Sequence, residues 1–294
     1  MLQLHDINRS FGDRRVLKDV AFTVEGGRMT GFVGGNGAGK TTTMRVILGV
    51  LSPDSGEVTF DGTPVTEEQR HHFGYMPEER GLYPKMKVAE QIEYLGRLHG
   101  MSSKDAAASA TTLLEKLGLG ERLNDTVESL SLGNQQRAQI AAALVHEPDV
   151  LILDEPFSGL DPIAVEVVLN VLKDFASRGA PVLFSSHQLD IVERLCDDLV
   201  VIADGSIRAK GSREQLRADH TTPRYEIQLE GDAGWLRTEA GVSVVEFDGG
   251  YAVFDVASAA DAQRVLAKAV AAASVIKFAP IVPSLSQIFK EVIQ

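Results

Sequence analysis

A glycine-rich segment between residues 31 and 50 constrains this chain more than any other. A short apolar run at residues 31–33 leads into the pattern G-x-x-x-x-G-K-T, formed by Gly34, Gly39, Lys40 and Thr41. Glycines let backbone N–H groups turn inward around a triphosphate, where a Cβ would collide, and a helix N-terminus adds partial positive charge. The lysine reaches the β- and γ-phosphates, and the threonine hydroxyl can ligate Mg²⁺. Because strand, loop and helix follow in this order, the segment predicts a site for a nucleoside triphosphate rather than a chance glycine-rich turn.

Size and charge narrow the possible functions. The 294 residues suit two domains, and a 44% hydrophobic content is ordinary for a globular protein with a real core. A net charge of −12 argues against nucleic acid as the main partner, since phosphate-binding surfaces cluster Lys and Arg. The single cysteine, Cys196, cannot form an internal disulfide, which fits a reducing cytoplasm. We find no signal peptide and no apolar run near the roughly 20 residues of a membrane helix, so another chain would supply any membrane span.

The first part of the chain predicts a doubly wound α/β core. Residues 1–31 and 56–62 read as an antiparallel β layer, and residues 87–144 have helical periodicity. Nearly unbroken apolar runs at residues 149–156 and 181–187 are typical of parallel strands buried on both faces. The remaining expected elements are helices at residues 163–177 and 189–195 and a hairpin that turns at Asp204 and Gly205.

A polar break at residues 219–223 predicts a domain boundary, with a nucleotide-binding domain at 1–219 and a small α+β domain at 220–294. The second domain carries no chemical motif. Its expected elements are strands at 224–231, 242–250, 251–256 and 276–281, a helix at 259–272, and a closing helix capped by Ser284 or Ser286.

Several side chains near strand and helix ends carry chemistry. Asp154 and Glu155 end the run LILDEP, where open α/β sheets place ligands, so Asp154 is suited to Mg²⁺ and Glu155 to polarising an attacking water. His187 ends the next strand and can contact the γ-phosphate, whereas the other histidines are expected to be solvated. Ser131, the backbone around Gly133 and the helix start that follows form an anion site like that of the loop. The alternative for the two acids is simple solvation at a strand end.

Together these motifs resemble an ABC-type ATPase, the nucleotide-binding subunit of an ABC transporter. The phosphate loop GGNGAGKTT (residues 34–42), the signature LSLGNQQR (130–137), LILDEP (151–156), SGLD (158–161) and His187 follow the family's order over residues 1–219. The resemblance implies a P-loop ABC fold with a helical subdomain. It also implies that the site binds ATP together with Mg²⁺. It implies that Phe11 stacks on adenine. It also implies that the nucleotide is bound by Gly34, Asn36, Gly37, Ala38, Gly39, Lys40, Thr41 and Thr42.

Two departures from the family pattern point to one subgroup. The family signature is LSGGQ, but here Leu132 replaces the first glycine and Asn134 the glutamine. Glu78 stands where the family has glutamine, so the metal ligands implied are Thr41, Glu78 and Asp154. In these features and in its C-terminal domain the chain resembles ATP-binding subunits of ABC-2 type exporters, which include drug- and sodium-efflux systems.

The resemblance also implies an assembly. Two ATPase subunits, a homodimer or two close relatives, would meet head to tail at the inner face of the cell membrane beneath a separate transmembrane permease. Ser131 and Gly133 would act across the dimer, Lys40 would bind phosphate, Glu155 would be the base and His187 the switch. A DNA-repair ATPase would need a coiled coil before the signature, and residues 43–130 show no sustained heptads. A ribosome-acting protein would need two ATPase domains, which leaves a soluble or regulatory ABC ATPase as the main alternative.

Overall fold

The computed structural model describes residues 1–79, 81–219 and 223–281. The chain divides into two compact units, the first spanning Met1–Arg213 and the second beginning at Glu214. Helix α8 (Arg213–Asp219) lies between this point and the boundary predicted from the sequence at residue 219. The closing helix predicted at residues 284–294 lies outside the described residues.

A six-stranded sheet forms the centre of the first unit. It contains the strands that the apolar runs and the hairpin predict, together with one, Phe73–Met76, that sequence reasoning missed. Its order is β10-β9-β3-β8-β7-β6, and all neighbours are parallel except the terminal hairpin of β9 and β10. Every residue of β3, β7 and β8 is buried, which is the environment that continuous Val, Ile and Leu runs require. The strands span Met29–Val33 (β3), Phe73–Met76 (β6), Val150–Leu153 (β7), Val182–Ser186 (β8), Asp198–Ala203 (β9) and Ser206–Ser212 (β10).

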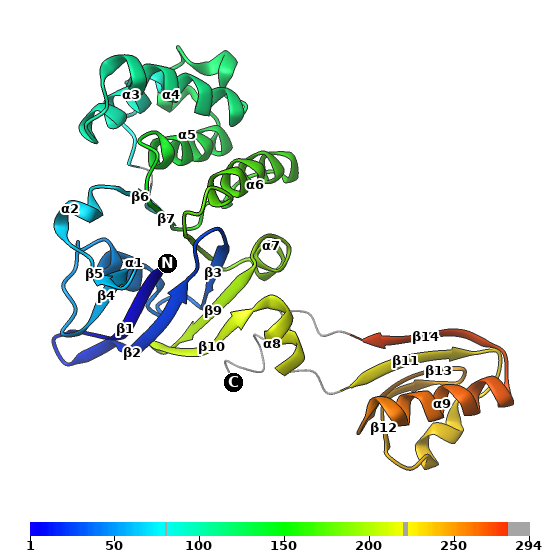
Figure 1. Ribbon diagram of the computed structural model, residues 1–294. Coiled ribbons are helices and arrows are strands. Elements are labelled where there is room, and N and C mark those ends of the chain that lie inside the picture. The colour runs from blue at the N-terminus through cyan, green and yellow to red at the C-terminus, as the bar shows by residue number, and fades with distance from the viewer. Residues whose placement is uncertain (80, 220–222, 282–294) are drawn as a thin grey trace. The chain divides into compact units, whose positions relative to one another are not determined.

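An antiparallel layer of order β2-β1-β4-β5 packs beside this sheet through a shared core (Figure 1). Phe22 of β2 meets Phe32 of β3 with ring centroids 5.2 Å apart. Helix α1 (Lys40–Ile47) joins the same core through Met44 and Ile47, which are fully buried. The layer consists of Leu2–Phe11 (β1), Arg14–Val24 (β2), Ser55–Phe60 (β4) and Thr63–Pro64 (β5).

Helices α3, α4 and α5 form a separate group within the first unit, away from the β1–β2 layer (Figure 1). Serine side chains start two of them: Ser102 caps α4, and Ser131 caps α5 by accepting the Asn134 N–H. The helices of this unit are Glu67–Arg70 (α2), Val88–Leu98 (α3), Ser103–Lys116 (α4), Leu132–Leu144 (α5), Pro162–Ala176 (α6) and Leu189–Leu195 (α7), with short 3₁₀ turns at Gly120–Arg122 (η1) and Val127–Ser129 (η2).

The second unit is a four-stranded antiparallel sheet covered on one face by α9 (Ala259–Ala272). After α8, its chain order is strand, 3₁₀ turn, two strands, helix, strand, and its sheet order is β12-β13-β11-β14. This is the ferredoxin-like arrangement with the first helix reduced to the turn η3 (Gly234–Thr238). The strands are Arg224–Leu229 (β11), Val242–Asp248 (β12), Tyr251–Val256 (β13) and Val275–Ile281 (β14).

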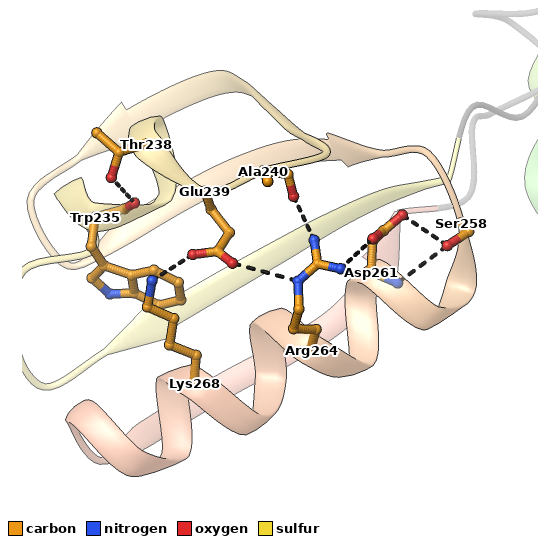
Figure 2. Close-up of polar contacts among 8 residues, drawn as sticks. All are labelled: Trp235, Thr238, Glu239, Ala240, Ser258, Asp261, Arg264 and Lys268. Atoms are coloured by element: carbon orange, nitrogen blue, oxygen red, sulfur yellow. Dashed lines mark hydrogen bonds and ion pairs between the residues drawn. The ribbon is translucent and has the colours of Figure 1, made fainter.

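Figure 2 shows how polar contacts fasten α9 to the segment between η3 and β12. Lys268 Nζ lies 2.5 Å from Glu239 Oε2 and 4.9 Å from the centre of the Trp235 ring. Arg264 donates to the Ala240 carbonyl and to Asp261 Oδ1. The basic partners Lys268 and Arg264 are about half exposed, so water screens these ion pairs and each contributes little to stability.

Among the described residues, none of the helices combines the length and apolar character that crossing a membrane requires.

Candidate nucleotide site

A cavity of about 580 Å³ opens at the edge of the central sheet where its parallel strands end. That volume lies within the range of ordinary small-ligand sites. Its walls come from the β1–β2 turn, the phosphate loop, and the residues that follow β6, β7 and β8. The lining residues are Phe11, Arg14, Val16, Gly35, Asn36, Gly37, Ala38, Gly39, Lys40, Thr41, Thr42, Glu78, Asp154, Glu155 and His187.

The two glycines that define the loop motif are required by space and backbone conformation. A Cβ on Gly34 would lie 2.5 Å from the Ile202 carbonyl oxygen, so only glycine fits against β9. Gly39 adopts φ +113° and a Cβ there would lie 2.8 Å from Leu17 Cδ2. Gly39 is also the N-cap of α1 and has no side chain to bond the N–H groups of the first turn. That end of α1 therefore presents donors to an anion.

The loop is held from behind by the β9–β10 turn. Gly205 donates its N–H to the Ala38 carbonyl at 3.1 Å and accepts the Lys18 N–H at 2.8 Å. The Lys40 ammonium folds back onto the loop and donates to the carbonyls of Gly34 (2.6 Å) and Gly35 (3.3 Å). These contacts hold the loop in its curved shape, with the Lys40 ammonium at its centre.

The Asp154 carboxylate, which lies beside the loop, accepts hydrogen bonds from two hydroxyl groups. The Thr41 hydroxyl donates to Asp154 Oδ2 at 2.9 Å, and the Ser185 hydroxyl donates to Oδ1 at 2.5 Å. Asp154 is 1% exposed, and a buried carboxylate beside a hydroxyl is the oxygen-rich setting that Mg²⁺ prefers. The residues present therefore fit the metal that the sequence implies. Ser185 was missed by sequence reasoning, although it precedes His187 in the strand run LFSSH.

Glu155 follows directly and faces His187. Its Oε2 lies 2.9 Å from His187 Nδ1, and its N–H donates to Ser185 Oγ at 2.9 Å. Glu155 adopts φ +53°, an unusual conformation for a residue with a Cβ, and only 8% of it is exposed. The sequence prediction that Asp154, Glu155 and His187 lie at one sheet edge matches the structure, which brings all three to the same cavity.

Glu78 lines the same cavity, after β6. Burial raises the pKa of the neighbouring Tyr75 hydroxyl, and the carboxylates of Asp154 and Glu78 act in the same direction, which places both acids within electrostatic reach of it. Within the described ranges, no group of three or more His, Cys, Asp and Glu side chains is arranged to hold a metal ion. A magnesium ion here would therefore depend on hydroxyl, water and phosphate oxygens besides Asp154. The role of Glu78 stays a prediction.

The signature residues Ser131 and Gly133 lie outside the described lining of this cavity. Ser131 Oγ accepts the Asn134 N–H at 3.4 Å, and Gly133 packs against the turn before α6, where a Cβ would lie 3.4 Å from the Gly159 carbonyl oxygen. The lining of the cavity, as far as the chain is described, includes neither Ser131 nor Gly133. Leu132 is 60% exposed between them. The sequence could group these residues with the site only through the family resemblance, which assigns them to a second subunit.

Phe11 and Arg14 line the cavity on the side of the β1–β2 turn. Phe11 is half exposed, and the Arg9 guanidinium lies 5.1 Å from its ring centroid. Arg14, which sequence reasoning missed, shares the lining with Phe11 across the β1–β2 turn. A flat ring beside a basic side chain is suited to a purine base carrying phosphates.

One expectation about the histidines is wrong. His146 is half-buried rather than solvated, and its ring stacks on His99 with centroids 3.7 Å apart. Burial, and then the nearby His99, lower the pKa of His146 to about 4, so this histidine is neutral at physiological pH.

The loop after β3, the acid pair after β7, two strands away in the sheet, and the parallel sheet itself define a P-loop nucleotide-binding protein. A family model described as "ABC transporter" matches residues 17–158, and one described as "ATP-binding protein DrrA1-3-like, C-terminal domain" matches residues 211–293.

Individual relatives agree with this class. YhaQ of Bacillus subtilis, an uncharacterized ABC transporter ATP-binding protein, is 39% identical over 82% of this chain and 81% of its own length. The linearmycin resistance ATP-binding protein LnrL of Bacillus subtilis is 35% identical over 73% of this chain and 70% of its own. A solved ATP-binding subunit of an ABC transporter superposes with a TM-score of 0.69 at 32% identity, covering 74% of this chain and 92% of that one. The chain belongs to the ABC transporter ATP-binding proteins, and it is an ATPase of the ABC type.

Proposed function

We propose that this chain is the ATP-hydrolysing subunit that powers a separate transmembrane permease, in an exporter of the ABC-2 type. The observation that carries the ATP hydrolysis in this proposal is the arrangement of Thr41, Asp154, Glu155 and His187 around one cavity beside the phosphate loop. Export is supported by relatives that are named for linearmycin resistance and for Nod factor export. A relative of 27% identity, described as part of the ABC transporter complex cbiONQ, supports assembly with other subunits.

The chain's own residues can divide the reaction among them. The loop N–H groups and Lys40 bind the phosphates, and the ammonium exchanges its two carbonyl contacts for phosphate oxygens. Thr41 and Asp154 would hold Mg²⁺, which when bound neutralises charge on the phosphates. Glu155 accepts a proton from the water whose oxygen bonds to the γ-phosphorus as the bond to the β-phosphate oxygen breaks. His187 holds the Glu155 carboxylate at 2.9 Å and orients it toward that water.

The working unit in this proposal is a dimer at the cytoplasmic face of the membrane. Ser131 and Gly133 lie outside the cavity of their own chain, and Ser131 begins a helix whose N-terminus can bind an anion. A second copy would place them against the γ-phosphate. The net charge of −12 makes nucleic acid a poor partner. We assign nucleotide binding to residues 1–219 and an accessory role to residues 220–294.

Nucleotide binding and single-turnover hydrolysis by the purified chain, with and without membranes, test this function. Lys40→Ala should abolish ATP binding, because it removes a charge-assisted contact to the β- and γ-phosphates. Glu155→Gln should retain binding, lose hydrolysis and accumulate an ATP-bound dimer.

The competing function is an ABC protein that binds ATP without turning it over, and Leu132 in the signature favours it. Parent protein that binds ATP yet releases no phosphate in a single turnover would support this alternative. Turnover by Glu155→Gln at the parent rate would instead overturn the assignment of the base.

A further inference from the structure

A buried glutamine on α5 contacts the backbone of the proposed catalytic base. The side-chain amide of Gln136, 4% exposed, donates from Nε2 to the Glu155 carbonyl at 2.9 Å. Gln136 is distant from Glu155 in sequence, and α5 belongs to the helical group rather than to the central sheet. The contact therefore joins the helical group to the segment that follows β7, next to the proposed catalytic carboxylate.

The Glu155 backbone is held by contacts on both sides. Its N–H donates to the Ser185 hydroxyl, and its carbonyl accepts both the Ser158 N–H, at 3.2 Å, and the Gln136 amide. The φ of +53° is a conformation that a residue with a Cβ keeps only when its surroundings impose it. Because the backbone fixes the direction of Cβ, these contacts set where the Glu155 side chain leaves the chain, and the His187 contact then holds its carboxylate.

The same face of α5 also contacts the segment around Glu78. Gln139, one helical turn beyond Gln136 and 3% exposed, donates to the carbonyl of Glu79 at 3.2 Å, and the Pro77 carbonyl lies 3.5 Å from the same nitrogen. Helix α5 thus contacts the backbone of both acidic segments that line the cavity, the one at Glu155 and the one around Glu78. That helix begins at Ser131, the residue proposed to contact the nucleotide of a second subunit.

We propose that Gln136 is a positioning residue that clamps the Glu155 peptide to α5 and so ties the catalytic carboxylate to the helix that starts at Ser131. This inference rests on the proposed role of Glu155 as the base. A glutamine suits the task because a neutral amide reaches the carbonyl without adding charge beside Asp154 and Glu155. Displacement of α5 at its N-terminus would then move the Glu155 turn with it, because the helix is stiff over this length.

Gln136→Met tests the clamp, since methionine has nearly the same length and volume but lacks the N–H donor. The matched control is Gln91→Met, because Gln91 is a buried glutamine, 1% exposed, on α3 of the same helical group. Gln136→Met should lower kcat about 10- to 100-fold with KM for ATP within about twofold of the parent, as expected for a misplaced catalytic group. In a Glu155→Gln background the same change should cause no further loss. Gln91→Met should leave kcat within about twofold.

Hydrogen exchange of the nucleotide-free chain tests the contact without using activity. Gln136→Met should speed exchange of the Ser158 amide, which donates into the Glu155 turn, and Gln91→Met should not. Unchanged exchange together with parent-like kcat would overturn the proposal, and so would equal losses of ATP binding and kcat. If Gln136→Met does not fold, kcat and Ser158 amide exchange are measured on Gln136→Asn instead. Asparagine keeps the amide but is too short to reach the Glu155 carbonyl, so the same changes are expected. A parent chain without hydrolysis but with the expected exchange difference would count against the proposed function alone.

Discussion

Replacing Ser185 by alanine should destabilise the first unit more than any other change of a single hydroxyl near the site. Ser185 is fully buried, donates to the Asp154 carboxylate and accepts the Glu155 N–H. Alanine would leave a buried carboxylate oxygen and a buried N–H without this partner. A hydrogen bond to a charged group contributes about 1.5–3 kcal/mol and a neutral one about 0.5–1.5 kcal/mol, so we expect a loss of about 2–4 kcal/mol in the free energy of unfolding.

Ser186→Ala is the matched control on the same strand. Ser186 is 2% exposed, and its hydroxyl accepts one neutral hydrogen bond, from the Gln188 N–H at 3.0 Å. Its removal should cost about 1 kcal/mol. Calorimetry or circular dichroism of the full chain suits the comparison, because the single tryptophan, Trp235, lies in the second unit and its fluorescence would not report on the first. Equal destabilisation by the two alanines would refute the reasoning.

Three further predictions follow from the site and the domains. Glu78→Gln should raise the Mg²⁺ concentration for half-maximal ATPase and keep substantial turnover at saturating Mg²⁺, because a hard cation binds a carboxylate more strongly than an amide; superimposable titrations would remove Glu78 from the metal site. Residues 1–219 alone should still bind ATP but lose dimer stability or permease coupling, and a folded truncation that binds no nucleotide would contradict this. Burial raises the pKa of the Cys196 thiol from 9.0 to about 12, so iodoacetamide at pH 8 should alkylate it only after unfolding, and rapid labelling of folded protein would contradict the burial.

Local sequence patterns predicted most elements of the fold. The helix expected at residues 163–177 is α6 (Pro162–Ala176), because Asp161 as N-cap and Pro162 at the first turn are strong start signals. The hairpin expected at Asp204 and Gly205 joins β9 to β10, since both residues adopt the positive φ that this turn requires. Strand runs and helical periodicity also located the four strands and α9 of the second unit, whereas α8 and the turn η3 were missed.

The parts that sequence reasoning missed depend on pairing between distant segments. Ser185 reaches Asp154 only because β7 and β8 are parallel neighbours with Leu153 opposite Phe184. In the sequence, Gln136 is one more residue of the signature. Its contact with Glu155 exists only because α5 packs against the Glu155 turn. The ferredoxin-like order of the second unit depends in the same way on strand pairing, which no local pattern specifies.

The turn at Gly205 has a consequence for how ATP can act on this protein. Because this turn braces the Ala38 carbonyl, the phosphate loop is preorganised, and nucleotide binding there orders little that was not already ordered. A ligand shifts a conformational equilibrium only as far as it binds the two states differently, so a loop with a single shape provides anchorage but no switching. The loop backbone would anchor the phosphates that ATP and ADP share in the same way, and discrimination between the two nucleotides would rest on the γ-phosphate end of the cavity, at Lys40, Glu155 and His187.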